Sequence, residues 1–169
     1  SASLVGSEMC IRDRFQPGHQ VEWAKLLLQL DMHRPADWHL VTARRLYDLA
    51  MTRGWDDEHG GLVYGYAPDG SFADAHKYFW VHAEAIATAW RLYDRTGDAR
   101  YRTDYDRLWS WSWDHLVDHK HGAWYRITTR EGDWLEPCKS PAGKVDYHTM
   151  GACWDVLSVM RAAGNLEEK

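Results

Sequence analysis

The sequence contains two similar stretches, Asp57-Glu58-His59-Gly60-Gly61-Leu62-Val63-Tyr64 and Asp118-His119-Lys120-His121-Gly122-Ala123-Trp124-Tyr125, which lie 61 residues apart. Each stretch is followed by a second turn and then by a long apolar segment, which is entered through Lys77 or Lys144. A repeat of this length is typical of helix-pair architectures, in which one unit alone cannot bury its apolar face. The repeat therefore predicts an α/α toroid.

Helical periodicity around these stretches predicts five helices. Pro17 is a suitable opening residue, because a proline at the first helical position loses no hydrogen bond, and Gly54, Gly97 and Gly164 are suitable stops. The predicted helices cover residues 18–30, 35–54, 78–95, 99–118 and 145–163. Two short hairpins pair residues 62–66 with 71–73 and residues 123–127 with 133–135, and residues 139–144 form a loop. An odd number of helices predicts that a partner helix is missing upstream.

Composition favours one globular domain or part of a larger one, with 169 residues of which 45% are hydrophobic and 27% charged. The 20 Lys and Arg stand against 25 Asp and Glu, and the net charge of -5 argues against a nucleic-acid partner. No apolar run is long enough to cross a membrane. Cys10, Cys138 and Cys153 are an odd number without ligand spacing, so we expect no disulfide framework and a cytoplasmic location.

The chain is rich in aromatic and imidazole side chains, with 11 Trp, 9 Tyr and 10 His. Aromatic faces stack on sugar rings, and histidine transfers protons near neutral pH. A core rich in aromatic residues has the same composition. This feature alone therefore leaves sugar chemistry and core packing open.

Residues 1–14 differ in character from the rest of the chain. They lack the long apolar run of a secretory signal and the aromatic residues that mark the other segments. The stretch Met9-Cys10-Ile11-Arg12-Asp13 resembles the translation of an adapter used in sequencing libraries. We expect residues 1–14 to be a foreign or disordered leader, and the sequence to be a metagenomic fragment. A native disordered tail is the alternative.

Two histidines stand where predicted helices begin. His19 and Glu22 are three residues apart, so they share a helix face on which a carboxylate can orient an imidazole. A solvated surface pair has the same spacing. His148 likewise lies in a first turn, directly after a hairpin and a loop. Both histidines are therefore candidates for proton transfer.

Lys77, Trp80 and Glu84 form a third candidate set. Offsets of three and seven residues place them on one stripe of the predicted third helix. A cation, an indole and a carboxylate on one stripe suit a polar ligand with a face that can stack. A buried tryptophan flanked by a salt bridge would give the same pattern.

The sequence predicts neither a metal site nor a cofactor. His115 and His119 are four residues apart and His121 follows, but no cysteine or convincing further ligand accompanies them. Solvated histidines at the C-terminal end of a helix are favoured by the helix dipole. Neither a glycine-rich phosphate loop nor a dinucleotide fingerprint is present.

Three segments resemble, in order, segments of the N-acylglucosamine 2-epimerase superfamily. Pro17-Gly18-His19-Gln20-Val21-Glu22-Trp23-Ala24 is similar to its eighth-helix motif, and Lys77-Tyr78-Phe79-Trp80-Val81-His82-Ala83-Glu84-Ala85 to its Lys-x-x-Trp-x-x-x-Glu-Ala segment. Lys144-Val145-Asp146-Tyr147-His148 stands where the superfamily carries its last catalytic histidine. The Gly-His-Gln-x-Glu-Trp form is most similar to the superfamily's aldose–ketose isomerases of mannose and sulfoquinovose, and less so to its 2-epimerases.

The resemblance implies an all-α fold, the C-terminal part of an (α/α)6 barrel over residues 15–164, followed by a tail at 165–169. It implies metal-free and cofactor-free isomerisation of a monosaccharide through a cis-enediol. His19 with Glu22 would open the sugar ring, and His148 would move the proton at C2. Lys77, Trp80 and Glu84 would line or support the pocket.

The chain departs from the superfamily in length, because a whole member is roughly twice as long. The upstream half would supply an arginine and another histidine, so we expect this fragment to be inactive alone. Its inner helix faces would be partly exposed, which favours self-association into a homo-oligomer. A sugar 2-epimerase, a carbohydrate-binding domain and a structural or regulatory relative stay open as alternatives.

Overall fold

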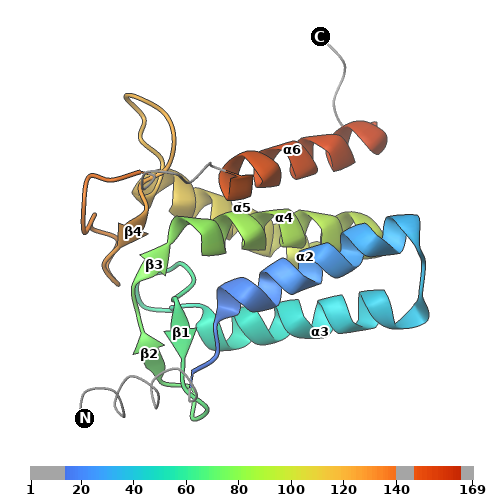
Figure 1. Cartoon of the computed structure of the whole chain (residues 1–169), viewed down its shortest axis with the longest axis horizontal. Helices are drawn as coiled ribbons and strands as arrows, with labels where there is room; N and C mark the ends of the chain where they lie inside the picture. The colour runs from blue at the N-terminus through green and yellow to red at the C-terminus, as the bar shows by residue number, and fades with distance from the viewer. Residues whose placement is uncertain (1–13, 140–146, 165–169) are drawn as a thin grey trace, which may run out of the picture.

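The computed structural model of the chain describes residues 14–139 and 147–164 (Figure 1). The predictions for residues 1–13 of the leader, for most of the loop at 139–144 and for the tail at 165–169 therefore lie outside the described residues. Arg14 is described, and its guanidinium lies 3.8 Å from the carboxylate of Asp74. In the described parts of the chain, no helix is both long and apolar enough to cross a membrane.

The described residues form the five helices that the periodicity predicts. They are α2 (Pro17–His33), α3 (Asp37–Gly54), α4 (Phe79–Thr96), α5 (Ala99–His115) and α6 (Tyr147–Ala162). Residues at the helix ends explain where several of these helices begin or stop. Pro17 opens α2, Gly97 ends α4 with a left-handed φ of 68°, and Asp98 caps α5 by accepting a hydrogen bond from the backbone N–H of Arg100.

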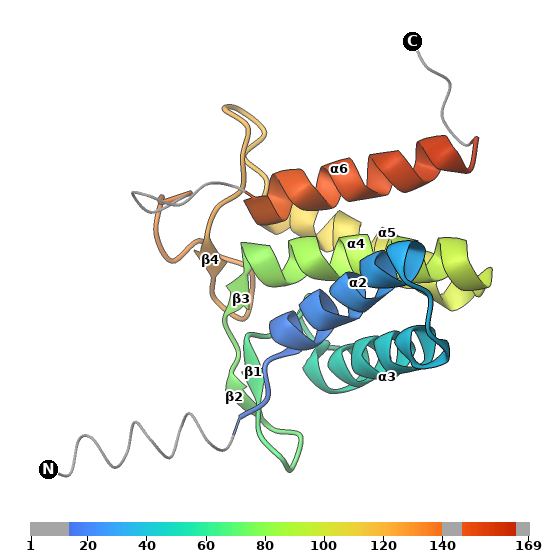
Figure 2. The same cartoon turned by 45° about the vertical axis from the view of Figure 1, so that its right-hand side comes forward.

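Helix α4 packs between α2 and α6, while α3 packs on α2 and α5 packs on α4 (Figures 1 and 2). Twelve residues of α4 are buried, more than in any other described helix, because α4 has neighbours on three sides. Helices α2, α4 and α6 all begin at the end of the molecule where the strands lie (Figure 2). Their first turns are therefore close to one another.

Four short strands cover this end of the helices. Strand β1 (Gly65–Tyr66) pairs antiparallel with β2 (Phe72–Asp74), which confirms the first predicted hairpin. Strand β3 (Lys77–Tyr78) pairs with β4 (Ile127–Thr128). The second predicted hairpin is only partly correct, because β4 uses β3 as its ladder partner and meets its own return segment in a single bridge, Thr128 with Trp134. The second hairpin is thereby attached to the segment that enters α4.

The repeat has a period of 62 residues in the structure, and not the 61 that the letters suggest. The backbone N–H of Gly60 donates to the carbonyl of Asp56, and that of Gly122 donates to the carbonyl of Asp118. The carboxylates of the two aspartates cap their turns in the same way. Ala123, with a φ of 62°, takes the place that Gly61 holds in the first copy. Because the second copy has alanine at this position, matching the glycines of the two copies by letter gives a period one residue too short.

Candidate active site

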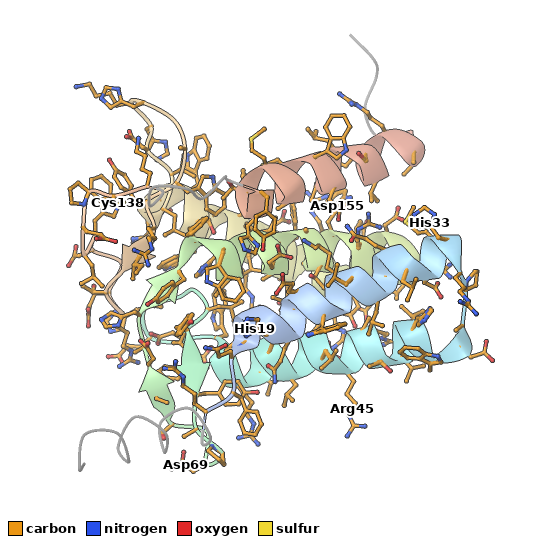
Figure 3. All side chains as sticks on the ribbon, viewed as in Figure 1. His19, His33, Arg45, Asp69, Cys138 and Asp155 are labelled. Carbon is orange, nitrogen blue, oxygen red and sulfur yellow. The ribbon has the colours of Figure 1, made fainter. Side chains whose placement is uncertain are left out.

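The first turns of α2, α4 and α6 bring three predicted site residues together. His19 lies at the start of α2, as Figure 3 labels it, Trp80 at the start of α4 and His148 at the start of α6. The ring centroid of Trp80 is 5.2 Å from that of His19 and 5.4 Å from that of His148. Two imidazoles therefore flank one indole, although the three residues are far apart in the sequence.

Gly18 makes this approach sterically feasible. A Cβ added at Gly18 would lie 2.4 Å from Cη2 of Trp80 and 2.8 Å from Cγ2 of Val81. Only a residue without a side chain allows the indole to pack so closely against the backbone of α2. The Gly-His pair of the sequence thus has a packing reason, which is to set His19 beside the ring of Trp80.

His148 is held by a buried carboxylate. Its Nδ1 lies 2.7 Å from Oε1 of Glu84, whose side chain is only 1% exposed, while the imidazole itself is 15% exposed. An ionised carboxylate can only accept, so Nδ1 is the donor. In the neutral imidazole the other nitrogen, Nε2, is then free to take up a proton. The carboxylate therefore fixes the tautomer that a general base needs.

The other carboxylate oxygen of Glu84 has a cationic partner. The ammonium of Lys25, from α2, forms an ion pair with Oε2 of Glu84. The Lys25 side chain is 12% exposed, so the pair is largely shielded from water. A continuous series of polar contacts thus runs from Lys25 through Glu84 to His148 and joins α2, α4 and α6.

Glu22 belongs to this cluster as well. One carboxylate oxygen of Glu22, one of Glu84 and a ring nitrogen of His148 all lie within 4.8 Å of one another. By contrast, neither a hydrogen bond nor an ion pair joins Glu22 to His19, although both residues are described. The pairing that their spacing predicted is therefore not formed, because Glu22 faces α4 and α6.

These three groups are also the one set of neighbouring His, Cys, Asp or Glu side chains in the described residues that could hold a metal ion. Both carboxylate oxygens of Glu84 are already engaged, by Lys25 and by His148, and an ammonium ion repels a metal cation. The arrangement suits proton transfer better than metal binding. That the site works without a metal or cofactor stays a prediction.

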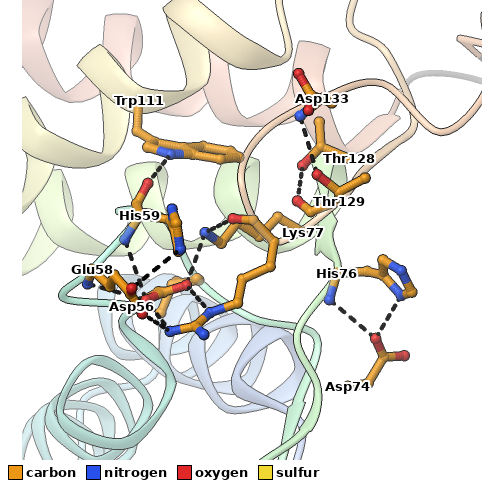
Figure 4. Close-up of polar contacts among 12 residues, drawn as sticks. Asp56, Glu58, His59, Asp74, His76, Lys77, Trp111, Thr128, Thr129 and Asp133 are labelled. Atoms are coloured by element: carbon orange, nitrogen blue, oxygen red, sulfur yellow. Dashed lines mark hydrogen bonds and ion pairs between the residues drawn. The ribbon is translucent and has the colours of Figure 1, made fainter.

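Lys77 lies elsewhere, which corrects the expected stripe of Lys77, Trp80 and Glu84. It belongs to β3, because α4 begins only at Phe79, and its side chain is fully buried. Its ammonium lies 3.2 Å from Oδ2 of Asp56 and donates to the carbonyl of Arg130 (Figure 4). Lys77 therefore joins the turn at Asp56 to the second hairpin and does not face His148.

Burial and ion pairing act against each other in the Lys77–Asp56 pair, and burial is the larger cause at Lys77, whose pKa is lowered. Burial raises the pKa of Asp56, but hydrogen bonds from the guanidinium of Arg130 and the charge of Lys77 outweigh burial and hold that pKa well below its usual range. The second repeat has an equivalent pair, in which the ammonium of Lys139 lies 2.5 Å from Oδ2 of Asp118. The structural counterpart of Lys77 is thus Lys139, and the Lys144 that the sequence suggested lies outside the described residues.

Sequence reasoning missed one residue of this site and one buried histidine of α4 that stacks on Trp111 near Lys77. His82 is buried in α4, where Nε2 accepts from the backbone N–H of Leu62 and Nδ1 donates to the carbonyl of Tyr78. Burial is the main cause that lowers the pKa of His82 to about 3. Lys25 is the other missed residue, and the recurrence of His19, Glu22 and Lys25 at every third position could have indicated it.

Comparison with known protein families identifies the family of this chain. The family model described as N-acylglucosamine 2-epimerase (GlcNAc 2-epimerase) matches residues 4–152. The chain belongs to the N-acylglucosamine 2-epimerase family.

Family relatives include both isomerases and epimerases. A D-mannose isomerase of Marinomonas mediterranea is 56% identical over 146 residues, which are 86% of this chain and 37% of the relative. An N-acylglucosamine 2-epimerase of Bos taurus is 28% identical over 168 residues, which are 94% of this chain and 40% of that relative. The chain thus spans less than half the length of these relatives.

Parts of solved isomerase and epimerase structures have the same fold as this chain. A crystal structure of D-mannose isomerase matches with a TM-score of 0.83 and 56% identity, over 85% of this chain and 37% of that one. The cellobiose 2-epimerase of Spirochaeta thermophila matches in fold, with a TM-score of 0.74 and 18% identity over 88% and 39% of the two chains. The predicted fold class, part of an (α/α)6 barrel with five helices and short hairpins, is confirmed.

Proposed function

We propose that this chain supplies the acid–base part of an aldose–ketose isomerase that converts D-mannose into D-fructose without a metal. The observation that carries the proposal is the contact of 2.7 Å between Glu84 and His148, beside the ring of Trp80. The 56% identity to a D-mannose isomerase supports mannose as the substrate. The proposed ligand is therefore a monosaccharide.

His148 is the proposed base for the proton at C2 of the open-chain sugar. Nε2 takes the C2 proton, the electrons of that bond form the C1–C2 double bond, and the aldehyde oxygen at C1 gains a proton. The resulting cis-enediol loses the proton of its C2 hydroxyl while C1 takes a proton, which gives the ketose. A histidine suits both directions of transfer at neutral pH.

His19 is the proposed catalyst of ring opening. It takes the proton of the anomeric hydroxyl and returns a proton to the ring oxygen. Its exposed imidazole lies beside Trp80, whose flat face suits the apolar face of a sugar. Glu22, expected to assist His19, lies in the cluster of Glu84 and His148 and is proposed to hold a sugar hydroxyl there.

The chain alone is expected to have negligible turnover. It spans 37% of the length of the D-mannose isomerase, and only α2, α4 and α6 contribute to the site described here. Helices α2 and α6, which lie on either side of α4, expose large apolar side chains, among them Trp23 of α2 and Trp154 of α6. Self-association of the isolated chain and its cytoplasmic location stay predictions.

The test uses a chimera in which this chain replaces the matched 146 residues of the Marinomonas relative. We expect the chimera to form D-fructose from D-mannose, and His148→Asn to lower kcat about 10²–10⁴-fold, the usual contribution of an acid–base group. His33→Asn, at the exposed far end of α2, is the matched control and should keep full activity. An active His148→Asn chimera would refute the assignment.

A 2-epimerase is the second candidate, because the N-acylglucosamine 2-epimerase of Bos taurus aligns over 94% of this chain. The product separates the two reactions, since an epimerase returns an aldose with inverted C2 and an isomerase returns a ketose. Binding of sugar by the chimera without any turnover, retained in His19→Asn and His148→Asn, would instead indicate a carbohydrate-binding domain. Binding of a protein partner without binding of sugar would indicate a structural or regulatory relative.

A further inference from the structure

We infer that Lys25 is a positioning residue for the acid–base histidine, acting through Glu84. The inference rests on the proposed function for its catalytic consequence, but the contact itself belongs to the structure. Lys25 holds Oε2 of Glu84 in an ion pair, and this leaves Oε1 to accept from Nδ1 of His148. The role assigned to Lys25 includes no contact with a reacting atom.

The charges around Glu84 show why a cation is needed there. The carboxylate of Glu22 lies within 4.8 Å of both Glu84 and His148, so two negative groups share a site that is closed to water on the side of Glu84. Like charges at this distance repel, and the ammonium of Lys25 offsets the repulsion. Both carboxylates also act on Tyr147, because burial and then the charges of Glu22 and Glu84 raise the pKa of Tyr147.

The geometry of the pair explains how a change at Lys25 reaches His148. Without the ammonium, Oε2 of Glu84 would be buried next to Glu22 with no cation to balance it. Rotation of the Glu84 carboxylate, or the binding of a proton to it, would then lower the free energy of the site. A protonated Glu84 would donate a hydrogen bond to His148, whereas the ionised carboxylate accepts one. His148 would lose the fixed Nδ1–H tautomer, and the fraction of rings with a free Nε2 would fall.

The first experiment observes the tautomer directly in the 169-residue chain. The chain is labelled with ¹⁵N-histidine, the signals of His148 are assigned through His148→Asn, and spectra are recorded at roughly pH 8.5, where an ordinary imidazole is neutral. We expect Nδ1 to be protonated in the parent chain and in Lys25→Arg, and a mixture of tautomers in Lys25→Met. The same tautomer in all three chains would overturn the inference.

The second experiment measures the catalytic consequence in the chimera. We expect Lys25→Met to lower kcat about ten- to hundredfold, the size of effect that outer partners of metal-binding histidines have, with KM little changed. Lys25→Arg should restore most of kcat, while Lys120→Met, at an exposed turn, controls for the loss of one positive charge. A rise in KM at constant kcat, or a loss that arginine leaves in place, would contradict a positioning role.

The two experiments separate the inference from the proposed function. A chimera without isomerase activity refutes the function, but the tautomer spectra still decide about Lys25. An active chimera in which Lys25→Met behaves as the parent refutes the inference alone. Should Lys25→Met fail to fold, Lys25→Gln keeps a polar head without the charge and takes its place in both experiments.

Discussion

Replacing Gly18 by alanine tests the packing that creates the site. The added Cβ would lie 2.4 Å from Cη2 of Trp80, far inside the contact distance of about 3.5–4.0 Å between carbon atoms. The indole must therefore move, and such overpacking usually costs about 1–3 kcal/mol. In a helix interior alanine gains up to about 1 kcal/mol of helix propensity over glycine, so a net loss of about 0–2 kcal/mol is expected.

Gly151 provides the matched control, because it is also helical and a Cβ there would meet nothing within 4 Å. Gly151→Ala should stabilise the chain by about 0.5–1 kcal/mol, so the two variants should differ by the overpacking cost of about 1–3 kcal/mol. Thermal unfolding followed by circular dichroism measures both, with about 2–4 °C expected per kcal/mol at this size. A Gly18→Ala chain stabilised as much as Gly151→Ala would show that Trp80 does not pack against α2 as described.

Three further predictions concern the supporting structure. Because burial lowers the pKa of His82 from 6.5 to about 3, unfolding takes up a proton below pH 6.5, so stability falls as the pH drops toward 3. The slope should reach about 1.4 kcal/mol per pH unit in urea titrations and be smaller in His82→Leu. Lys77→Met leaves Asp56 buried without its ammonium and should cost about 3 kcal/mol in the same assay. Deleting residues 1–14 removes the partly exposed ion pair of Arg14 with Asp74 and should change Tm by less than about 2 °C; a cooperative loss of structure would show a native element there.

The helices could be predicted from the sequence because their signals are local. Apolar periodicity marked each helix, and Pro17, Gly97 and Asp98 act at the ends as their types predict. The repeat was recognised, but its register was one residue off. The residue after the turn glycine, Gly60 or Gly122, has a left-handed φ in both copies. This residue is Gly61 in the first copy and Ala123 in the second, so similar letters stand at positions that are not equivalent.

The members of the site could be predicted in part, since a first turn fixes where a residue lies along its helix. Their partners could not, because the partners depend on how neighbouring helices pack. Glu84 meets His148 across α4 and α6, and Lys25 meets Glu84 across α2 and α4. The predicted place of Lys77 on a helix is wrong for a similar reason, because Lys77 pairs with Thr128 in a strand and α4 begins only at Phe79.

The exchange of deuterium from solvent into C2 of D-mannose tests the central claim most directly. The chimera is incubated with D-mannose in D₂O, and the deuterium at C2 of the recovered aldose is measured by NMR against time. If His148, oriented by Glu84, moves this proton, the parent chimera exchanges it and His148→Asn does so at least about 10²-fold more slowly. His148→Asn exchanging at the parental rate would mean that another base acts at C2, and the proposed mechanism would be wrong.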